Sequence, residues 1–193
     1  MTKRVTAADL LAQLEKDPDF AARREKQDRV VKARAEALQQ EEAPLVADLR
    51  AVGFDVASVW DLANSSRDYG EAVPLLLSHL ARPYSSSIRE GIARALGTPA
   101  AMSEWPVLIS RDESENDLRV KDGLAATLSA IANDSVLDSV ITLVRDSANG
   151  PSRLMLLRAL AKSRAPKARE TLMALREDAF FEKEAKFLLR TLA

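Results

Sequence analysis

The chain has 193 residues, a length typical of one domain or of one domain with an appendage. Apolar residues make up 47% of it, and 28 Lys and Arg against 29 Asp and Glu leave a formal charge of -1. This balance argues against a protein whose whole surface is built to bind nucleic acid. Cysteine is absent and His79 is the single histidine, which excludes disulfides, thiolate catalysis, Cys- or His-rich metal sites and most His-based triads.

The first twenty residues mix apolar and charged side chains and contain no seven-residue apolar core, which argues against a signal peptide. The densest apolar run covers residues 73–77, far short of the roughly 20 residues that span a bilayer. We therefore expect a cytoplasmic protein without membrane association. The absence of cysteine agrees with a reducing compartment.

Glycine, proline and capping residues predict helices from end to end. No long stretch alternates with period two, so we expect little or no sheet. Gly97-Thr98-Pro99 places a glycine after a helix end and a proline in the next first turn, and Ser87 with Glu90 fits a capping box. The expected helices cover residues 6–16, 18–42, 44–52, 55–64, 70–81, 87–96, 99–111, 117–132, 135–147, 151–163, 166–177 and 180–192.

Residues 1–54 form a separate N-terminal region, a helical cap or arm that is basic at residues 23–34. Its apolar spacing predicts a long amphipathic helix with a kink or break just before Pro44, because a residue before proline avoids the helical conformation. Three interpretations stay open: a polar cap for the helices that follow, a basic arm for an acidic partner, nucleic acid or lipid, and a dimer contact. Its alanine-rich apolar stripe makes a poor membrane anchor.

From about residue 70 the sequence repeats every 32 residues. One helix of each unit carries apolar or small residues at three positions, spaced as on a single buried helix face. These columns are Leu96, Leu128, Leu160 and Leu192; Ile92, Leu124, Leu156 and Leu188; and Ala95, Thr127, Ala159 and Thr191. A second helix of each unit repeats two further columns: Leu76, Leu108, Val140 and Leu172; and Leu77, Ile109, Ile141 and Met173. Each unit is therefore expected to be an antiparallel helix pair that buries its apolar face only in a stack.

The segments SIREGIARALGTPAA (87–101) and RLMLLRALAKSRAPKARETLMAL (153–175) resemble the HEAT-like repeats first recognised in phycobilin lyases. The resemblance covers residues 70–193 as four units, with a degenerate fifth at 44–64. It implies an all-α fold, an α-solenoid of four to five antiparallel helix pairs at residues 55–193 behind the N-terminal helical cap.

Basic residues recur on the helix of each unit that carries the Leu96 column, and in stacks of this kind that helix lines the inner surface. One column is Arg89, Lys121 and Arg153; another is Arg94, Ala126, Arg158 and Arg190, with Lys186 on the same face. Fewer acids lie on these helices, so the columns predict a positive concave groove for an acidic protein or peptide partner. The alternative is that these cations pair with neighbouring carboxylates and only solvate the surface.

The remaining polar and aromatic residues do not indicate a catalytic, nucleotide-binding or metal-binding site. Trp60 and Trp105 fall at core positions of the repeat, His79 has no ligand or carboxylate at a suitable spacing, and no nucleotide or metalloprotease motif is present. We therefore expect no catalytic residues, no metal and no cofactor.

Three classes of function remain. The first is a non-enzymatic interaction scaffold, adaptor or immunity-type inhibitor, which needs no catalytic residues. The second is a nucleic-acid-binding protein similar to HEAT-like DNA glycosylases, for which Asp61, next to Trp60, is the single candidate carboxylate. The third is a tetrapyrrole or cofactor chaperone-lyase, which the missing cysteines and histidines disfavour.

Overall fold

A computed structural model describes residues 6–7 and 18–191, and these residues contain helices and turns but no β-strand. The all-α prediction is thereby confirmed. Most of the predicted helix 6–16 lies outside the described residues, as does Leu192 of the repeat. The chain divides into two units, Met1–Ala43 and Pro44–Ala193, so the division falls before the predicted boundary at residue 54.

The helix α2 (Pro18–Ala51) begins in the first unit and ends in the second. In the first unit its side chains are largely exposed, Val30 and Val31 at 56% each. Of the predicted kink or break before Pro44, the break is wrong, because α2 includes this proline. A proline inside a helix costs about 3 kcal/mol, and the complete burial of Leu45 and Leu49 directly after it offsets that cost.

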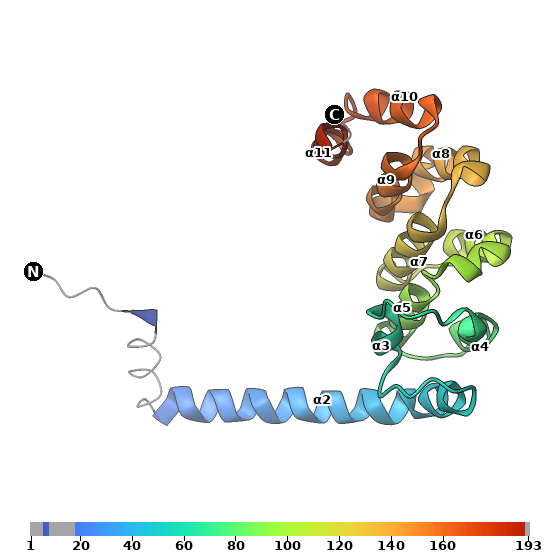
Figure 1. Cartoon of the computed structure of the whole chain (residues 1–193). Helices are drawn as coiled ribbons and strands as arrows, with labels where there is room; N and C mark the ends of the chain where they lie inside the picture. Colours follow the sequence, from blue (N-terminus) through green and yellow to red (C-terminus); the bar gives the residue numbers. More distant parts are fainter. Residues whose placement is uncertain (1–5, 8–17, 192–193) are drawn as a thin grey trace, which may run out of the picture. The chain divides into compact units, whose positions relative to one another are not determined.

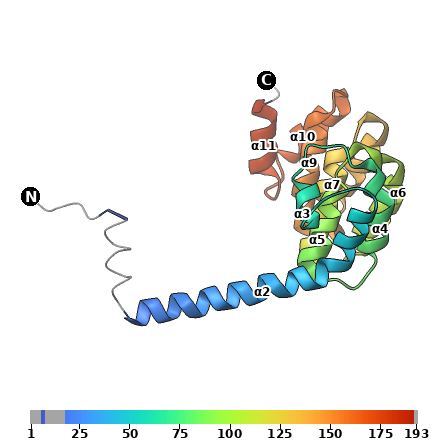
Figure 2. The same ribbon diagram turned by 60° about the horizontal axis from the view of Figure 1, so that its bottom comes forward.

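The second unit arranges its helices in two rows (Figures 1 and 2). In the odd row each helix packs on the next; its members are α3 (Val59–Ala63), α5 (Ser86–Ala95), α7 (Leu118–Ile131), α9 (Arg153–Lys162) and α11 (Glu182–Thr191). The even row flanks it: α4 (Val73–Leu80) packs on α5, α6 (Trp105–Ser114) on α7, α8 (Leu137–Arg145) on α9, and α10 (Pro166–Leu175) on α9 and α11.

Short 3₁₀ segments lead into several of these helices. They are η1 (Gly70–Ala72) before α4, η2 (Pro99–Glu104) before α6, η3 (Asp134–Val136) before α8 and η4 (Ser147–Ser152) before α9. Three of the four recur at similar places in the repeat, which explains why the expected helices began several residues too early there. Tight turns of this kind are frequent at helix N-termini.

The repeat columns of the odd row form the core. Leu96, Leu128 and Leu160 are buried, and so are the residues four positions before each of them. In the even row the first column is buried throughout, from Leu76 to Leu172. In the second column Ile141 is buried, Leu77 and Ile109 are half-buried, and Met173 is 48% exposed. The predicted core position of the second column is therefore confirmed in full for Ile141 and is wrong for Met173.

Two predicted helix boundaries have different outcomes. Gly97 follows the end of α5 and Pro99 lies in the first turn of η2, as predicted. The expected capping box at Ser87 is absent, because α5 begins at Ser86 and the Glu90 carboxylate binds arginines instead. A capping box instead starts α3, where the Asp61 Oδ2 accepts the backbone N–H groups of Ala57 and Ser58 at 2.8 and 3.0 Å. The helix predicted at 55–64 therefore begins at residue 59.

Candidate functional site

The first predicted basic column is turned into the fold. Lys121 is only 6% exposed, and its Nζ donates to the carbonyl oxygen of Asp112 in the last turn of α6 at 2.9 Å. One repeat later, the Arg153 guanidinium donates to the carbonyl oxygen of Val144 in the last turn of α8 at 3.3 Å. The prediction that Lys121 lines an open groove is wrong, because cations at this position satisfy the free carbonyls of a helix C-terminus.

Arg153 has further partners inside the fold. Its Nε donates to the carbonyl oxygen of Gly150 at 2.9 Å, and its guanidinium lies 4.8 and 5.0 Å from the ring centroids of Phe180 and Phe181. These contacts join the start of α9 to the segment that leads into α11 and hold the Arg153 side chain half-buried. The cation therefore stabilises the last repeat from within.

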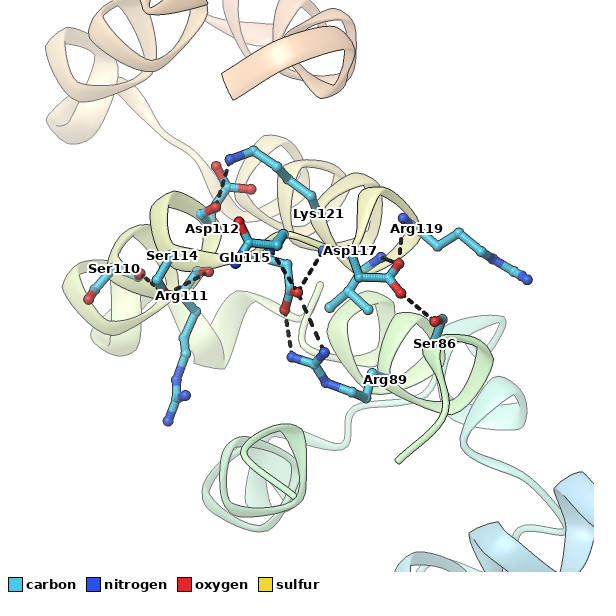
Figure 3. A network of polar contacts seen from close by, with 12 residues as sticks. Ser86, Arg89, Ser110, Arg111, Asp112, Ser114, Glu115, Asp117, Arg119 and Lys121 are labelled. Atoms are coloured by element: carbon cyan, nitrogen blue, oxygen red, sulfur yellow. Dashed lines mark hydrogen bonds and ion pairs between the residues drawn. The ribbon is translucent and has the colours of Figure 1, made fainter. Parts of the chain in front are cut away.

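Arg89 is held by an ion pair between α5 and the turn that joins α6 to α7 (Figure 3). Its two Nη atoms lie 2.5 and 3.5 Å from the carboxylate oxygens of Glu115, and this carboxylate also accepts the backbone N–H of Asp117 at 2.9 Å. Ser86 donates to the Asp117 carboxylate, and this hydrogen bond is the main cause that lowers the pKa of Asp117. For Arg89 the alternative interpretation, pairing with a carboxylate, therefore applies.

Asp112 is a buried acid that the sequence analysis missed. Its side chain is 1% exposed, and its Oδ1 accepts no hydrogen bond within the described part of the chain. Burial raises its pKa to about 6, against the attraction of Lys121, and the nearby Glu113 and Glu115 raise it further. The repeat pattern did indicate a buried position here, because the equivalent residues one unit earlier and one unit later are the buried Leu80 and Val144.

The second predicted column lies on the surface. The Arg94 Nε lies 3.0 Å from a carboxylate oxygen of Glu90, and Arg119 binds the other oxygen at 2.9 Å. Two guanidinium groups thus share one carboxylate. Arg158 and Arg190 are exposed and form no ion pair or side-chain hydrogen bond within residues 18–191.

The last two repeats carry a larger net positive charge than the rest of the second unit. Residues 153–191 contain 10 Lys and Arg against 5 Asp and Glu, whereas residues 44–152 contain 9 against 15. Most of the acids of residues 44–152 lie outside the odd row, because α5 and α7 together carry 4 Lys and Arg against 2 Asp and Glu. A basic face along the odd row therefore stays a prediction, and the last members of the predicted columns, on α9 and α11, lie in the most basic part of the chain.

Two predicted residues meet in a surface pocket between α10 and α11. The pocket has a volume of about 530 Å³ and is lined by Arg176, Glu177, Lys186, Leu189 and Arg190. Lys186 forms an ion pair with Glu182, and Arg176 lies 2.9 Å from a carboxylate oxygen of Glu177. Three cations and one acid line this C-terminal basic pocket, which makes it the candidate site for an anionic group. Sequence spacing identified Lys186 and Arg190 but not Arg176 or Leu189.

A second pocket of about 280 Å³ lies where α3, α5 and α7 meet. Its lining includes Trp60, Tyr69 and Arg94, and burial raises the pKa of the Tyr69 phenol. Trp60 is half-buried at this pocket instead of filling the core as predicted. Asp61, the candidate glycosylase carboxylate, caps α3 through two backbone hydrogen bonds.

Trp105 fits the predicted core position: it is buried, and its indole N–H donates to Ser139 Oγ at 3.3 Å.

His79 differs from the prediction, because it does have a carboxylate partner. It is fully buried, with Nε2 2.9 Å from Asp48 Oδ2 and Nδ1 2.9 Å from the Tyr84 hydroxyl. Asp48 comes from the end of α2, 31 residues earlier, so local spacing held no signal for this pair.

No group of three or more metal-ligating side chains occurs among the described residues. In the same part of the chain, no helix combines the length and apolar character needed to cross a bilayer.

No protein-family model matches the sequence, and neither the curated proteins nor the solved structures include a significant match. The comparisons therefore leave the resemblance to HEAT-like repeats as a prediction.

Proposed function

We propose that this protein is a cytoplasmic, non-enzymatic α-solenoid scaffold that binds an acidic protein segment at the C-terminal basic pocket. The observation that carries the proposal is the convergence of Arg176, Lys186 and Arg190 on one open pocket whose lining contains a single acid. Fixed positive charge at an exposed, partly apolar site attracts carboxylates and orients them.

Two features support the solenoid part of the proposal. Helices of the odd row pack successively on one another, and helices of the even row flank them. The buried positions recur at a spacing of 32 residues, as in Leu96, Leu128 and Leu160. In repeat proteins of this kind each unit contacts its neighbours, and the long surface serves recognition more than catalysis.

The distribution of charge favours a short acidic protein segment over nucleic acid. A duplex that extends beyond the last two repeats would approach residues 44–152, where Asp and Glu outnumber Lys and Arg by 15 to 9, although most of these acids lie outside the odd-row helices. Phosphates there would be repelled, and phosphate contacts supply most of the affinity for nucleic acid. In addition, the Asp61 carboxylate that a glycosylase-like reaction would need already accepts two backbone hydrogen bonds. A segment confined to the last two repeats avoids the acidic region.

The test is a titration with a fluorescent Glu-rich peptide, followed by anisotropy at low and moderate salt. The double variant Lys186→Glu/Arg190→Glu should weaken binding by at least about tenfold, because it reverses two charges that contact the ligand. The matched control is Arg111→Glu/Arg145→Glu, which changes the net charge equally at two exposed arginines of the even row. Equal losses in both variants would contradict the proposal, since the binding would then follow net charge alone.

Capture from a lysate of the native host then identifies the partner. We expect a discrete protein that the wild type and the even-row control retain and that the Lys186→Glu/Arg190→Glu variant loses. Recovery of nucleic acid instead, released steeply by salt, would favour the nucleic-acid alternative.

A further inference from the structure

One position of the odd-row helices faces the helix that follows. In α5 this position is Ala93: the α7 residue Thr127 donates from Oγ1 to the Ala93 carbonyl oxygen at 2.5 Å, and a Cβ added to Gly123 of α7 would lie 3.0 Å from the Ala93 Cβ. The equivalent residues one and two repeats later are Ala125 and Leu157, both buried. This position is therefore buried in the three helices that are followed by another helix of the row.

The same position in α11 is Leu189, one repeat after Leu157. Leu189 is only half-buried and lines the C-terminal basic pocket. Figures 1 and 2 show α11 as the last described helix of the odd row, next to α10. In the earlier repeats this face of α5, α7 and α9 lies against the next helix of the row. On α11 no described helix covers it.

We propose that the acidic segment binds as an amphipathic helix that packs on α11 as the next helix of the odd row. This inference rests on the proposed function and specifies the partner of the same pocket. The apolar side of the helix covers Leu189, and its carboxylates pair with Lys186 and Arg190. These two cations are four residues apart and flank Leu189 on one helix face, so a single helix reaches all three.

The existing helix contacts of the row indicate which residues such a helix presents. Added Cβ atoms at Gly91 and Gly123 would lie 2.7 and 3.0 Å from side chains of the preceding helix. The equivalent residues of α9 and α11 are Met155 and Phe187, so the later members of the row carry large apolar residues at this position. A partner helix that continues the row would carry an apolar residue opposite Leu189. Glu or Asp one turn to either side would meet the two cations.

Charge argues against a second copy of this chain on the same face. A twofold dimer through α11 would bring the Lys186 and Arg190 side chains of both copies into one interface. Like charges in such an interface repel each other. The complementary occupant is therefore an acidic helix from another protein.

The test compares two fluorescent 16-residue peptides of Ala, Leu and Glu. One has Leu at helical i, i+3 and i+4 spacing, and the other replaces a central Ala with Pro and keeps the same charge. Proline in a helix interior strongly disfavours the helix, so we expect the first peptide to bind about tenfold more tightly or better. Helical circular dichroism of that peptide should rise on binding.

Leu189→Asp should abolish the preference for the helical peptide and leave weak, charge-driven binding of both. Because Leu189 is half-buried, Leu189→Ala and the melting curve of each variant verify that the fold persists. Lys186→Glu/Arg190→Glu should weaken binding of both peptides, since both carry the same charge.

The outcomes separate this inference from the proposed function. Equal binding of the two peptides would overturn the helical mode while the basic pocket stands. An unchanged helical preference in Leu189→Asp would place the helix on another face and overturn the inference. Binding of neither peptide would overturn both proposals. A concentration-dependent dimer in sedimentation that Leu189→Asp removes would identify a second copy as the occupant and overturn the acidic partner.

Discussion

The repeats that contain α5 to α9 and the last repeat, α10 and α11, use the same positions differently. Lys121 and Arg153 satisfy carbonyls of the preceding even-row helix, whereas their equivalent in α11 is the buried Ala185. Leu157 is fully buried in α9, which α11 contacts, whereas Leu189 lines a surface pocket. A basic residue in a repeat protein therefore has to be interpreted by its neighbours in the stack, because spacing alone does not separate structural cations from accessible ones.

The largest difference between the two regions should appear in the apolar column. Leu128→Ala is expected to lower the free energy of unfolding by roughly 2–5 kcal/mol through lost transfer energy and a cavity, because Leu128 is fully buried in α7 between α5 and α9. Leu188→Ala in α11 should cost less than half as much, since one side of that helix has no described neighbour and can relax. Urea unfolding followed by circular dichroism measures both.

Equal losses for the two variants would contradict the open end of the odd row. A melting shift under about one degree for Leu128→Ala would contradict its core position, because 1 kcal/mol corresponds to roughly 2–4 °C in a domain of this size.

The buried acid of the earlier repeats should make stability depend on pH. Burial raises the pKa of Asp112 to about 6, above its value in the unfolded chain, so the folded protein binds this proton more tightly. The stabilisation is fully present below about pH 4 and is lost as the pH rises through 6. From pH 4 to pH 7 the wild type should therefore lose roughly 2–3 kcal/mol relative to Asp112→Asn.

Urea midpoints of both proteins at the two pH values test this expectation. Glu113→Gln, at an exposed neighbouring carboxylate, is the control and should keep most of the pH dependence. Parallel curves for the wild type and Asp112→Asn would show that Asp112 titrates normally in the folded protein.

Periodicity predicted the core well, because a 32-residue spacing of Leu and Ile directly reports which helix face is buried. It did not predict the continuity of α2 through Pro44, since the local cost of proline is offset by the packing of Leu45 and Leu49. It also gave no sign of the contact between His79 and Asp48, which only tertiary packing brings together. Predictions from local sequence fail where tertiary packing between distant residues determines the structure.

For the candidate site, spacing placed Arg158 and Arg190 on an exposed helix face and Arg94 on a half-buried one, but it did not reveal that Lys121 is buried. The two columns differ by only a few residues along the same helices, so one points at the preceding helix end and the other at solvent. The part played by Arg176 depends on how α10 lies against α11, which no spacing encodes. Asp112 was detectable, because an acid occupies a position that is apolar in the adjacent repeats.

Two lysines provide a sharper comparison of buried and accessible cations. Lys121→Met should lower the free energy of unfolding by about 1.5–3 kcal/mol, the usual value of a hydrogen bond to a charged group, because the methionine keeps the stem but loses the donor to Asp112. Lys186→Met should cost no more than about 0.5 kcal/mol, since Lys186 is exposed and its one ion-pair partner among the described residues is Glu182. Urea unfolding at neutral pH measures both, and a larger loss for Lys186→Met than for Lys121→Met would reverse the assignment.

The smallest effect on stability is expected at the two exposed arginines of α9 and α11. Arg158→Ala and Arg190→Ala should each change the free energy of unfolding by no more than about 0.5 kcal/mol, because neither side chain has a partner within residues 18–191. Binding should separate the two variants even so: only Arg190 lines the basic pocket, so only Arg190→Ala should weaken the acidic peptide. An equal loss with Arg158→Ala would extend the binding surface onto α9, and a loss of stability above about 1 kcal/mol in either variant would mean that the arginine supports the fold, as Arg153 does.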